Sequence, residues 1–314
     1  MQRVLTTATL VGLLIATTAA FTITERLKLE KSPITVGTRV SKVFSPTCGC
    51  ARGKANIRIK LRRSDTISVT VLDAHKRPVR FLVAGEHAPR GLNRFRWDGL
   101  GDTGARAPDG TYYAEIHLDR AHTTIVLPNK IELDTAPPKV TNLTTNREDN
   151  VFSPDGDGQA DYVRVHYQLT KPAHAILYLD GRRILGPTYR HPAKGELTWR
   201  GTAQGEPLPA GTYALQLGAV DLAGNSTPVA ERWEFDVTIR FIQIANHHIA
   251  GVSGGKRFEI GISTDSASYR WKLGRRTGVA SGPMLRLRAP QRAGRYTLTV
   301  TEHGHSDRAA VFVR

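Results

Sequence analysis

After residue 40, the sequence lacks the apolar spacing of amphipathic helices. Short strand-like runs, such as TISVTVLD (66–73) and YTLTVTE (296–302), alternate with turns rich in Gly, Pro, Asn and Asp. A composition of 40% hydrophobic and 23% charged residues is that of a folded protein, so wholesale disorder is not expected. These features predict an all-β protein of more than one domain.

Motifs for catalysis are also missing. The sequence has no paired carboxylates in a helical frame, no phosphate-binding loop and no Ser/His/Asp order in a familiar scaffold. Residues 251–255 match G-x-S-x-G formally, but a nucleophile elbow requires a strand that runs into a helix, and no helical pattern follows Ser253. We therefore expect no enzyme. The alternative is an unrecognised hydrolase in residues 241–314.

Cysteine is scarce, with only Cys48 and Cys50 in 314 residues. Neither lies at the end of the N-terminal apolar run, which argues against a lipoprotein anchor. Gly49 between them permits the turn that a local disulfide requires, so we predict a Cys48–Cys50 bridge. A pair of thiolates for a soft metal and links to other chains are the alternatives.

Charged residues are absent from position 4 to position 24. Twenty helical residues span about 30 Å, the thickness of a bilayer core. We predict a signal peptide or a membrane anchor over residues 1–24 and a linker over 25–41. Small residues at Thr18-Ala19-Ala20 suit cleavage, and residues 4–23 would contact the cytoplasmic membrane if uncleaved. Either outcome predicts an extracytoplasmic protein, secreted or membrane-anchored, for which nucleic acid is not an expected partner.

Two segments repeat within the sequence. VFSP occurs at 43–46 and 151–154, and FRWDGLGDTGARAPDGTYYAEIHLD (95–119) aligns with LTWRGTAQGEPLPAGTYALQLGAVD (197–221). We predict three domains, over 42–136, 137–240 and 241–314, with Pro137 and Pro138 stiffening the connection between the first two. A Tyr that follows a Gly turn suits a tyrosine corner of a β-sandwich. The candidate structural residues are Trp97, Tyr112, Trp199, Tyr213, Trp271 and Tyr296.

The second repeat combines FSPDGDG…D (152–161), W…PxGTY (199–213) and AVDLAGN (219–225). This pattern resembles the immunoglobulin-like (Ig-like) repeat of the flagellar hook-capping protein and of many secreted bacterial proteins. It covers 151–237 well and 43–136 less well. The resemblance implies tandem Ig-like β-sandwiches after an N-terminal hydrophobic helix, used as a spacer, scaffold or adhesion unit without catalysis. The first repeat lacks the acidic loop and the AGN turn, and no hook-binding region is recognisable.

The acidic loop of the second repeat is a candidate metal site. Asp155, Asp157 and Asp161 alternate with glycines, and calcium prefers oxygen ligands from such loops. Read as a linear calcium loop, however, the sequence puts Arg164 where a bidentate Glu belongs. The other interpretation is that the Asp side chains close the turn by bonding backbone amides. Calcium is the one cofactor that the sequence raises.

Basic residues are concentrated in the outer domains. Lys and Arg outnumber Asp and Glu by 16 to 10 over 42–136 and by 12 to 4 over 241–314, whereas 137–240 has 11 against 12. Alternation in IRIKLRR (57–63) and LRLRA (285–289) places these charges on the outer face of strands. Such faces serve solubility or bind an anionic envelope polymer or glycan. We expect a non-enzymatic, exported bacterial cell-envelope scaffold or binding protein, with another envelope protein as the alternative partner.

Overall fold

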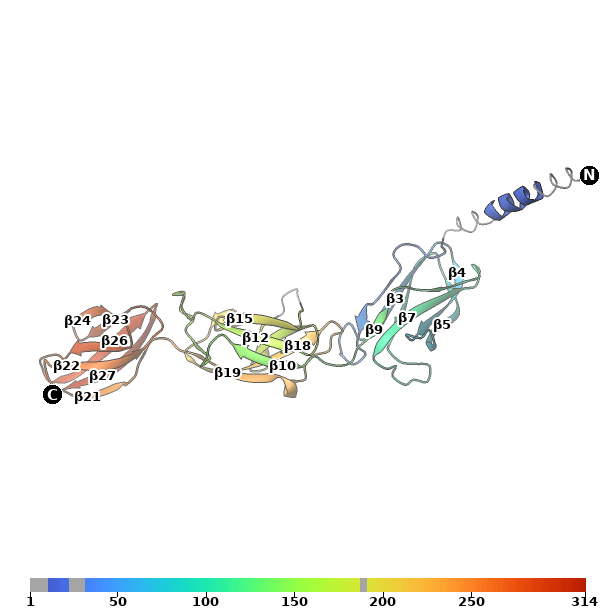
Figure 1. The fold of residues 1–314 in the computed structure, drawn as a ribbon. Coiled ribbons are helices and arrows are strands. Elements are labelled where there is room, and N and C mark those ends of the chain that lie inside the picture. The colour runs from blue at the N-terminus through green and yellow to red at the C-terminus, as the bar shows by residue number, and fades with distance from the viewer. Residues whose placement is uncertain (1–10, 23–31, 187–190) are drawn as a thin grey trace, which may run out of the picture. The chain divides into compact units, whose positions relative to one another are not determined.

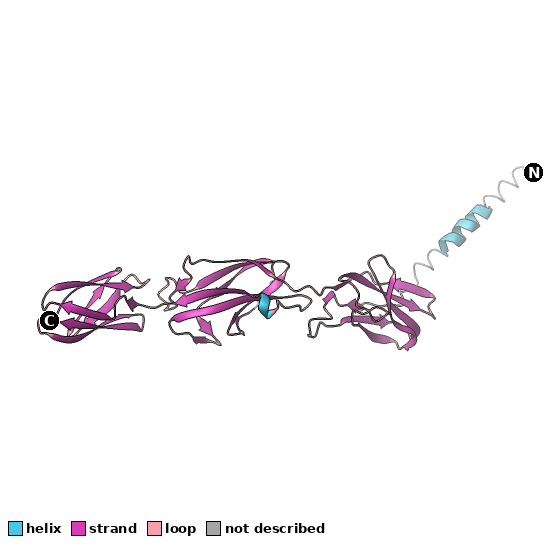
Figure 2. Cartoon of the chain, turned by 90° about the horizontal axis from the view of Figure 1, so that it is seen from below, coloured by secondary structure: helices cyan, strands magenta, loops and turns pink. Residues whose placement is uncertain are grey.

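A computed structural model describes residues 11–22, 32–186 and 191–314 (Figure 1). Apart from a helix over residues 11–22 and a 3-10 turn η1 (Val229–Glu231), the regular structure in these ranges is β-strand (Figure 2). The prediction of an all-β protein with an N-terminal hydrophobic helix is confirmed. The chain divides into two compact units, residues 1–135 and 136–314, and the second unit contains two sandwiches.

The N-terminal helix covers part of the predicted signal peptide or anchor. Its side chains are exposed, and the hydroxyls of Thr17, Thr18 and Thr22 donate to backbone carbonyls one turn earlier. Within the described ranges, we find no helix of the length and apolarity that a membrane span needs. Residues 1–10 and 23–31, which belong to the same prediction and to the predicted linker, lie outside the described residues.

The first sandwich packs two sheets around one core. The smaller sheet has the order β1-β3-β6, and the larger has the order β2-β9-β7-β4-β5, with β8 paired to β7. Apolar residues of β3 and β4 point inward because side chains alternate along a strand. The strands are β1 Arg39–Val40, β2 Val43–Phe44, β3 Ala55–Leu61, β4 Asp65–Leu72, β5 Pro78–Ala88, β6 Gly91–Trp97, β7 Gly110–Leu118, β8 Thr123–Val126 and β9 Ile131–Leu133.

The second sandwich repeats this plan, with sheets ordered β10-β12-β15 and β11-β19-β18-β13-β14 and a separate β16-β17 hairpin. Its core is a cluster of its own. The strands are β10 Val140–Thr145, β11 Val151–Phe152, β12 Val163–Leu169, β13 Ala173–Leu179, β14 Arg182–Leu185, β15 Lys194–Trp199, β16 Thr202–Ala203, β17 Glu206–Pro207, β18 Gly211–Asp221 and β19 Trp233–Ile239.

The third sandwich has sheets ordered β20-β22-β25 and β21-β27-β26-β23-β24 around a third core. Although this segment lacks VFSP, β21 pairs in parallel with the last strand, as β2 and β11 do in the other sandwiches. The strands are β20 Gln243–Ile244, β21 His248–Val252, β22 Arg257–Ser263, β23 Tyr269–Leu273, β24 Arg276–Ala280, β25 Met284–Arg288, β26 Gly294–Glu302 and β27 His305–Val313.

Candidate functional site

The repeated VFSP, Trp and GTY segments meet in one aromatic cluster in each of the first two sandwiches. Phe44 and Trp97 have ring centroids 5.2 Å apart, and Trp97 and Tyr112 are 4.7 Å apart. The corresponding distances in the second sandwich are 5.6 Å from Phe152 to Trp199 and 6.3 Å from Trp199 to Tyr213. The sequence repeat therefore encodes a packing unit of the core.

Each sandwich also has a tyrosine corner. The Tyr112 hydroxyl donates to the Pro108 carbonyl at 2.6 Å, that of Tyr213 to Pro209 at 2.7 Å, and that of Tyr296 to Arg292 at 2.9 Å. All three bonds reach back four residues. The geometry expected of these tyrosines is present, and it holds the turn before β7, β18 and β26.

Trp271 has a different place from the other two tryptophans. Trp97 and Trp199 end β6 and β15 and are fully buried, and their indole N–H groups donate to the carbonyls of Leu100 and Thr202. Trp271 lies in β23, on the larger sheet, and pairs with Gly278. The ring lies over that glycine, where an added Cβ would be 2.7 Å from it.

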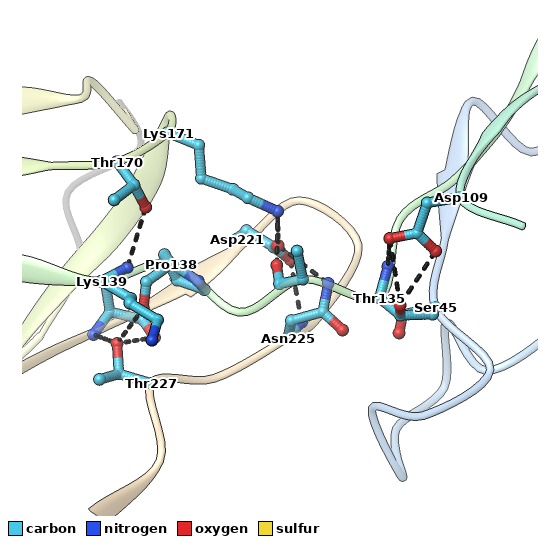
Figure 3. Close-up of polar contacts among 12 residues, drawn as sticks. Ser45, Asp109, Thr135, Pro138, Lys139, Thr170, Lys171, Asp221, Asn225 and Thr227 are labelled. Atoms are coloured by element: carbon cyan, nitrogen blue, oxygen red, sulfur yellow. Dashed lines mark hydrogen bonds and ion pairs between the residues drawn. The ribbon is translucent and has the colours of Figure 1, made fainter. Parts of the chain in front are cut away.

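The AVDLAGN segment closes a turn at the end of β18 (Figure 3). The buried carboxylate of Asp221 accepts from the backbone and side-chain amides of Asn225, both at 2.9 Å, and from the Lys171 ammonium at 3.0 Å. Thr227 donates its hydroxyl to the Pro138 carbonyl at 2.7 Å. The turn therefore fastens the first residues of the second sandwich. In the first unit, the Asp109 carboxylate accepts hydrogen bonds from the backbone N–H and the hydroxyl of Thr135.

The two VFSP loops are closed by different chemistry. After β2, the structure joins Cys48 and Cys50 by a disulfide, with their Cα atoms 5.2 Å apart. After β11, the carboxylate of Asp161 accepts from the backbone N–H groups of Gly156 and Gly158, at 2.7 and 2.9 Å. Asp161 therefore closes a turn, as one interpretation of the sequence holds.

Asp155 and Asp157 face two carboxylates that come from the third sandwich. One oxygen of each of these two residues, of Asp265 and of Glu302 lies within 4.8 Å of the others. Asp265 follows β22, and Glu302 is the last residue of β26. Ser266 donates its hydroxyl to Asp157 at 2.6 Å. We call these four carboxylates the junction cluster.

The membership of the junction cluster differs from the linear calcium loop considered above. Asp161 is not in it, and Arg164 lies in β12, where its guanidinium is 3.7 Å from Glu196. No sequence pattern links Asp265 and Glu302 to residues 155–161. These two residues meet the acidic loop only because the second and third sandwiches pack together. Whether the acidic loop binds calcium stays a prediction, to which the structure adds two new ligand candidates.

Burial and mutual repulsion shift the pKa values in the junction cluster. Burial, aided by the neighbouring carboxylates, raises the pKa of Asp155 to about 6 and raises the pKa of Asp265. Burial acts on Asp157 too, but hydrogen bonds from Ser266 and the Gln159 N–H outweigh it, so the pKa of Asp157 lies below its usual value.

A second candidate surface is the outer face of the smaller sheet in the first sandwich. Arg39 pairs in register with Arg58, and Arg58 pairs with Arg94, so three exposed arginines form a row across β1, β3 and β6. Lys60 and Arg96 are exposed on the same strands, and none of the three strands contains Asp or Glu. We call these five residues the basic face. In the third sandwich, by contrast, Arg286 forms an ion pair with Glu259 at 2.8 Å.

Ser253 does not occupy a nucleophile elbow. It follows β21 in a turn in which its carbonyl accepts from the Lys256 N–H at 3.1 Å, and the chain continues into β22. The strand-to-helix arrangement that the motif requires is therefore absent from this part of the described structure.

Comparison with known proteins supports the Ig-like fold. Residues 45–121 match the model of the FlgD Ig-like domain. These residues lie in the first sandwich, so the match does not depend on the acidic loop or the AGN turn. Among curated proteins, no sequence matches this chain.

Several solved structures of multi-domain proteins are similar over most of the chain. Titin domains I67–I69 share 12% identity, with 90% of this chain and 98% of theirs covered and a TM-score of 0.32. A mixed-linkage glucan utilisation protein of Bacteroides ovatus, SGBP-B, shares 15%, with 89% and 67% covered and a TM-score of 0.23. A bacterial ice-binding adhesin shares 9%, with 90% and 99% covered and a TM-score of 0.28. Residues 45–121 of this chain are therefore similar to the FlgD Ig-like domain.

Proposed function

We propose that this protein is a non-enzymatic scaffold or binding protein of the bacterial cell envelope, built from tandem Ig-like modules and located outside the cytoplasm. The observation that carries the proposal is that each sandwich has its own closed core and its own tyrosine corner. Modules of this kind fold as units and serve as spacers or binding surfaces. The apolar N-terminal run and the Cys48–Cys50 disulfide support export.

Intact mass of the protein recovered from its native membrane and culture medium tests the location. A mass that lacks roughly the first twenty residues means cleavage and release. Full-length protein in the membrane fraction means an anchor. Full-length protein in the cytoplasm with two free thiols would contradict export. Labelling of Ser253 by an active-site serine probe would instead favour the hydrolase alternative.

The basic face supports a second function, the binding of an anionic envelope polymer or glycan. Like charges directly opposite each other in a sheet are destabilising, and a bound polyanion relieves that repulsion. The row Arg39–Arg58–Arg94 has this arrangement. Because these side chains are exposed, we expect the interaction to weaken steeply as salt rises.

Binding to poly(glycerol phosphate), with uncharged dextran as the control polymer, tests this second function. The variant R58E/R94E should lose binding, whereas R182E/R183E should retain it. The control pair makes the same change in net charge on exposed residues of β14, in the nearly neutral second sandwich. Equal loss in both variants would mean that net charge alone drives binding. Binding that is indifferent to ionic strength would contradict the proposal.

A further inference from the structure

The second and third sandwiches are joined by a very short connection. β19 ends at Ile239 and β20 begins at Gln243. Phe241 packs against the core of the second sandwich, while its ring stacks on His305 of the third, with centroids 3.5 Å apart. The Arg240 N–H donates to the Phe152 carbonyl at 3.0 Å. This connection holds the loop after β11 close to the end of the third sandwich, where the junction cluster forms.

Glu302 is the most buried member of the junction cluster. Its side chain is only 5% exposed. One carboxylate oxygen, Oε2, accepts from the Thr264 hydroxyl, but the other, Oε1, has no donor group as a partner among the described residues. The Asp155 carboxyl lies near enough to bond Glu302, but only if a proton lies between the two carboxyl groups. Asp265 Oδ2 is likewise buried and without such a partner there. A buried carboxylate oxygen without a partner carries a large desolvation cost, so native proteins rarely leave one unsatisfied.

The charges around the junction cluster do not balance. Four carboxylates lie together, and no Lys or Arg of the described chain forms an ion pair with any of them. His303 is the nearby base that acts on Asp157. Mutual repulsion at such distances is strong unless protons or a cation offset it. Two solutions remain: carboxyl groups share protons, or a cation binds between them.

The donor set indicates which cation fits. All four side chains offer oxygen and none offers nitrogen or sulfur, which suits a hard divalent ion rather than zinc. Calcium takes six to eight oxygens in a flexible geometry, and four carboxylates with water complete such a shell. A pocket lined by residues of both sandwiches, including Ser153, Ala160 and Thr264, lies beside the cluster and has Asp265 in its lining.

We propose that Asp155, Asp157, Asp265 and Glu302 bind one calcium ion that joins the second sandwich to the third. The ion offsets two of the four negative charges and gives Glu302 Oε1 and Asp265 Oδ2 a partner. Because its ligands come from both sandwiches, binding fixes their junction and makes two modules into one stiff unit. This inference goes beyond the proposed function, because a scaffold needs no metal ion. It adds that calcium sets how rigid the joint between the second and third sandwiches is.

Calorimetric titration of the full chain with calcium chloride tests the proposal. We expect one ion per chain, with a dissociation constant of about 0.1–1 mM, the range of extracellular calcium modules. E302Q and D265N should each weaken binding at least tenfold, although both residues lie outside the acidic loop. E259Q, a change on an exposed strand residue of the same sandwich, should bind as the parent chain does. Sodium chloride at equal ionic strength controls for screening.

A second readout guards against variants that misfold. Calcium should slow hydrogen exchange in the segments around Asp157 and Ser266 of the parent chain and of E259Q, but not in E302Q, whose exchange elsewhere should match the parent. Absence of binding at several millimolar calcium would overturn the proposal. Protons shared among the four carboxyl groups would then explain how their charges are offset. Binding that survives both E302Q and D265N would also overturn it, by confining the site to the loop after β11.

Discussion

Ser266 of the third sandwich donates its hydroxyl to the Asp157 carboxylate of the second at 2.6 Å. Ser266 is buried, and Asp157 Oδ1 at the same time accepts from the Gln159 N–H at 2.7 Å. The loop after β11 is thus fixed by its own turn on one side and by the third sandwich on the other. A single hydroxyl therefore couples the conformations of two modules.

Replacement of that hydroxyl should loosen the junction. We expect S266A to lower the stability of the docked pair by about 1 kcal/mol, the usual net contribution of a hydrogen bond. Hydrogen exchange should rise near residues 155–159 and 264–268 and stay unchanged in the first unit. S268A, an exposed serine of the same loop, is the matched control. Unchanged exchange in S266A would show that the contact does not hold the two sandwiches together.

Loss of a tyrosine-corner hydroxyl should cost stability in every sandwich, and most in the first. Burial raises the pKa of Tyr112, which is only 5% exposed, whereas Tyr213 and Tyr296 are half-buried. We expect each Tyr→Phe change to cost about 1 kcal/mol, with Y112F at the upper end, because its hydrogen bond to Pro108 is part-buried whereas those of Tyr213 and Tyr296 are exposed. Chemical denaturation measures the losses.

The control for the corner series is Y162F, since Tyr162 precedes β12 and takes no part in a corner. A loss in Y162F equal to that in Y112F would mean that the general loss of a hydroxyl, rather than the corner bond, explains the result.

The aromatic clusters and corners could be read from the sequence, because each depends on a repeated local spacing. VFSP, the Trp and the GTY segment keep their order in two copies, and the fold brings them together in both. The alternation in β3 likewise predicted that Arg58 and Lys60 point outward. These features require only strand periodicity and one sandwich at a time.

Two other features could not be predicted from the sequence, because they depend on contacts between residues whose spacing along the chain follows no local pattern. The junction cluster needs Glu302 to meet a loop almost 150 residues earlier, across two modules. The row of three arginines needs the register between β1, β3 and β6, which alternation leaves open. The sequence likewise does not show that Trp271 lies in the larger sheet of its sandwich, whereas Trp97 and Trp199 lie in the smaller sheets of theirs.

Acid should remove the contribution of Asp73 to the β4–β5 turn. Hydrogen bonds from the Arg77 backbone N–H, the Arg77 guanidinium and the His75 N–H hold the pKa of Asp73 below its usual value. A carboxyl whose pKa is lowered by folding stabilises the fold above its unfolded pKa and loses that effect as pH falls through the folded value. D73N should therefore be less stable than the parent chain at pH 7 and equal to it at low pH.

Denaturation midpoints at pH 7 and below about pH 3 measure this gap, which should close between those values. E206Q in the short β16–β17 hairpin provides a carboxylate-to-amide control outside the first sandwich. A gap in D73N that persists unchanged in acid would mean that geometry, and not the charge of Asp73, stabilises the turn.

The loop after β2 should be closed by the Cys48–Cys50 disulfide in the exported protein. Alkylation before reduction should add no label at monomer mass, and alkylation after reduction should add two. We expect C48S/C50S to lose less than about 2 kcal/mol, because a bridge across so few residues removes little entropy from the unfolded chain. The same turn keeps its backbone bonds from Cys48 N to Ser45 O at 3.3 Å and from Gly53 N to Cys50 O at 3.0 Å. Two labels without reduction would instead establish free thiols. The interpretation of this pair as ligands of a soft metal would then stand again, and zinc titration of the reduced chain would decide it.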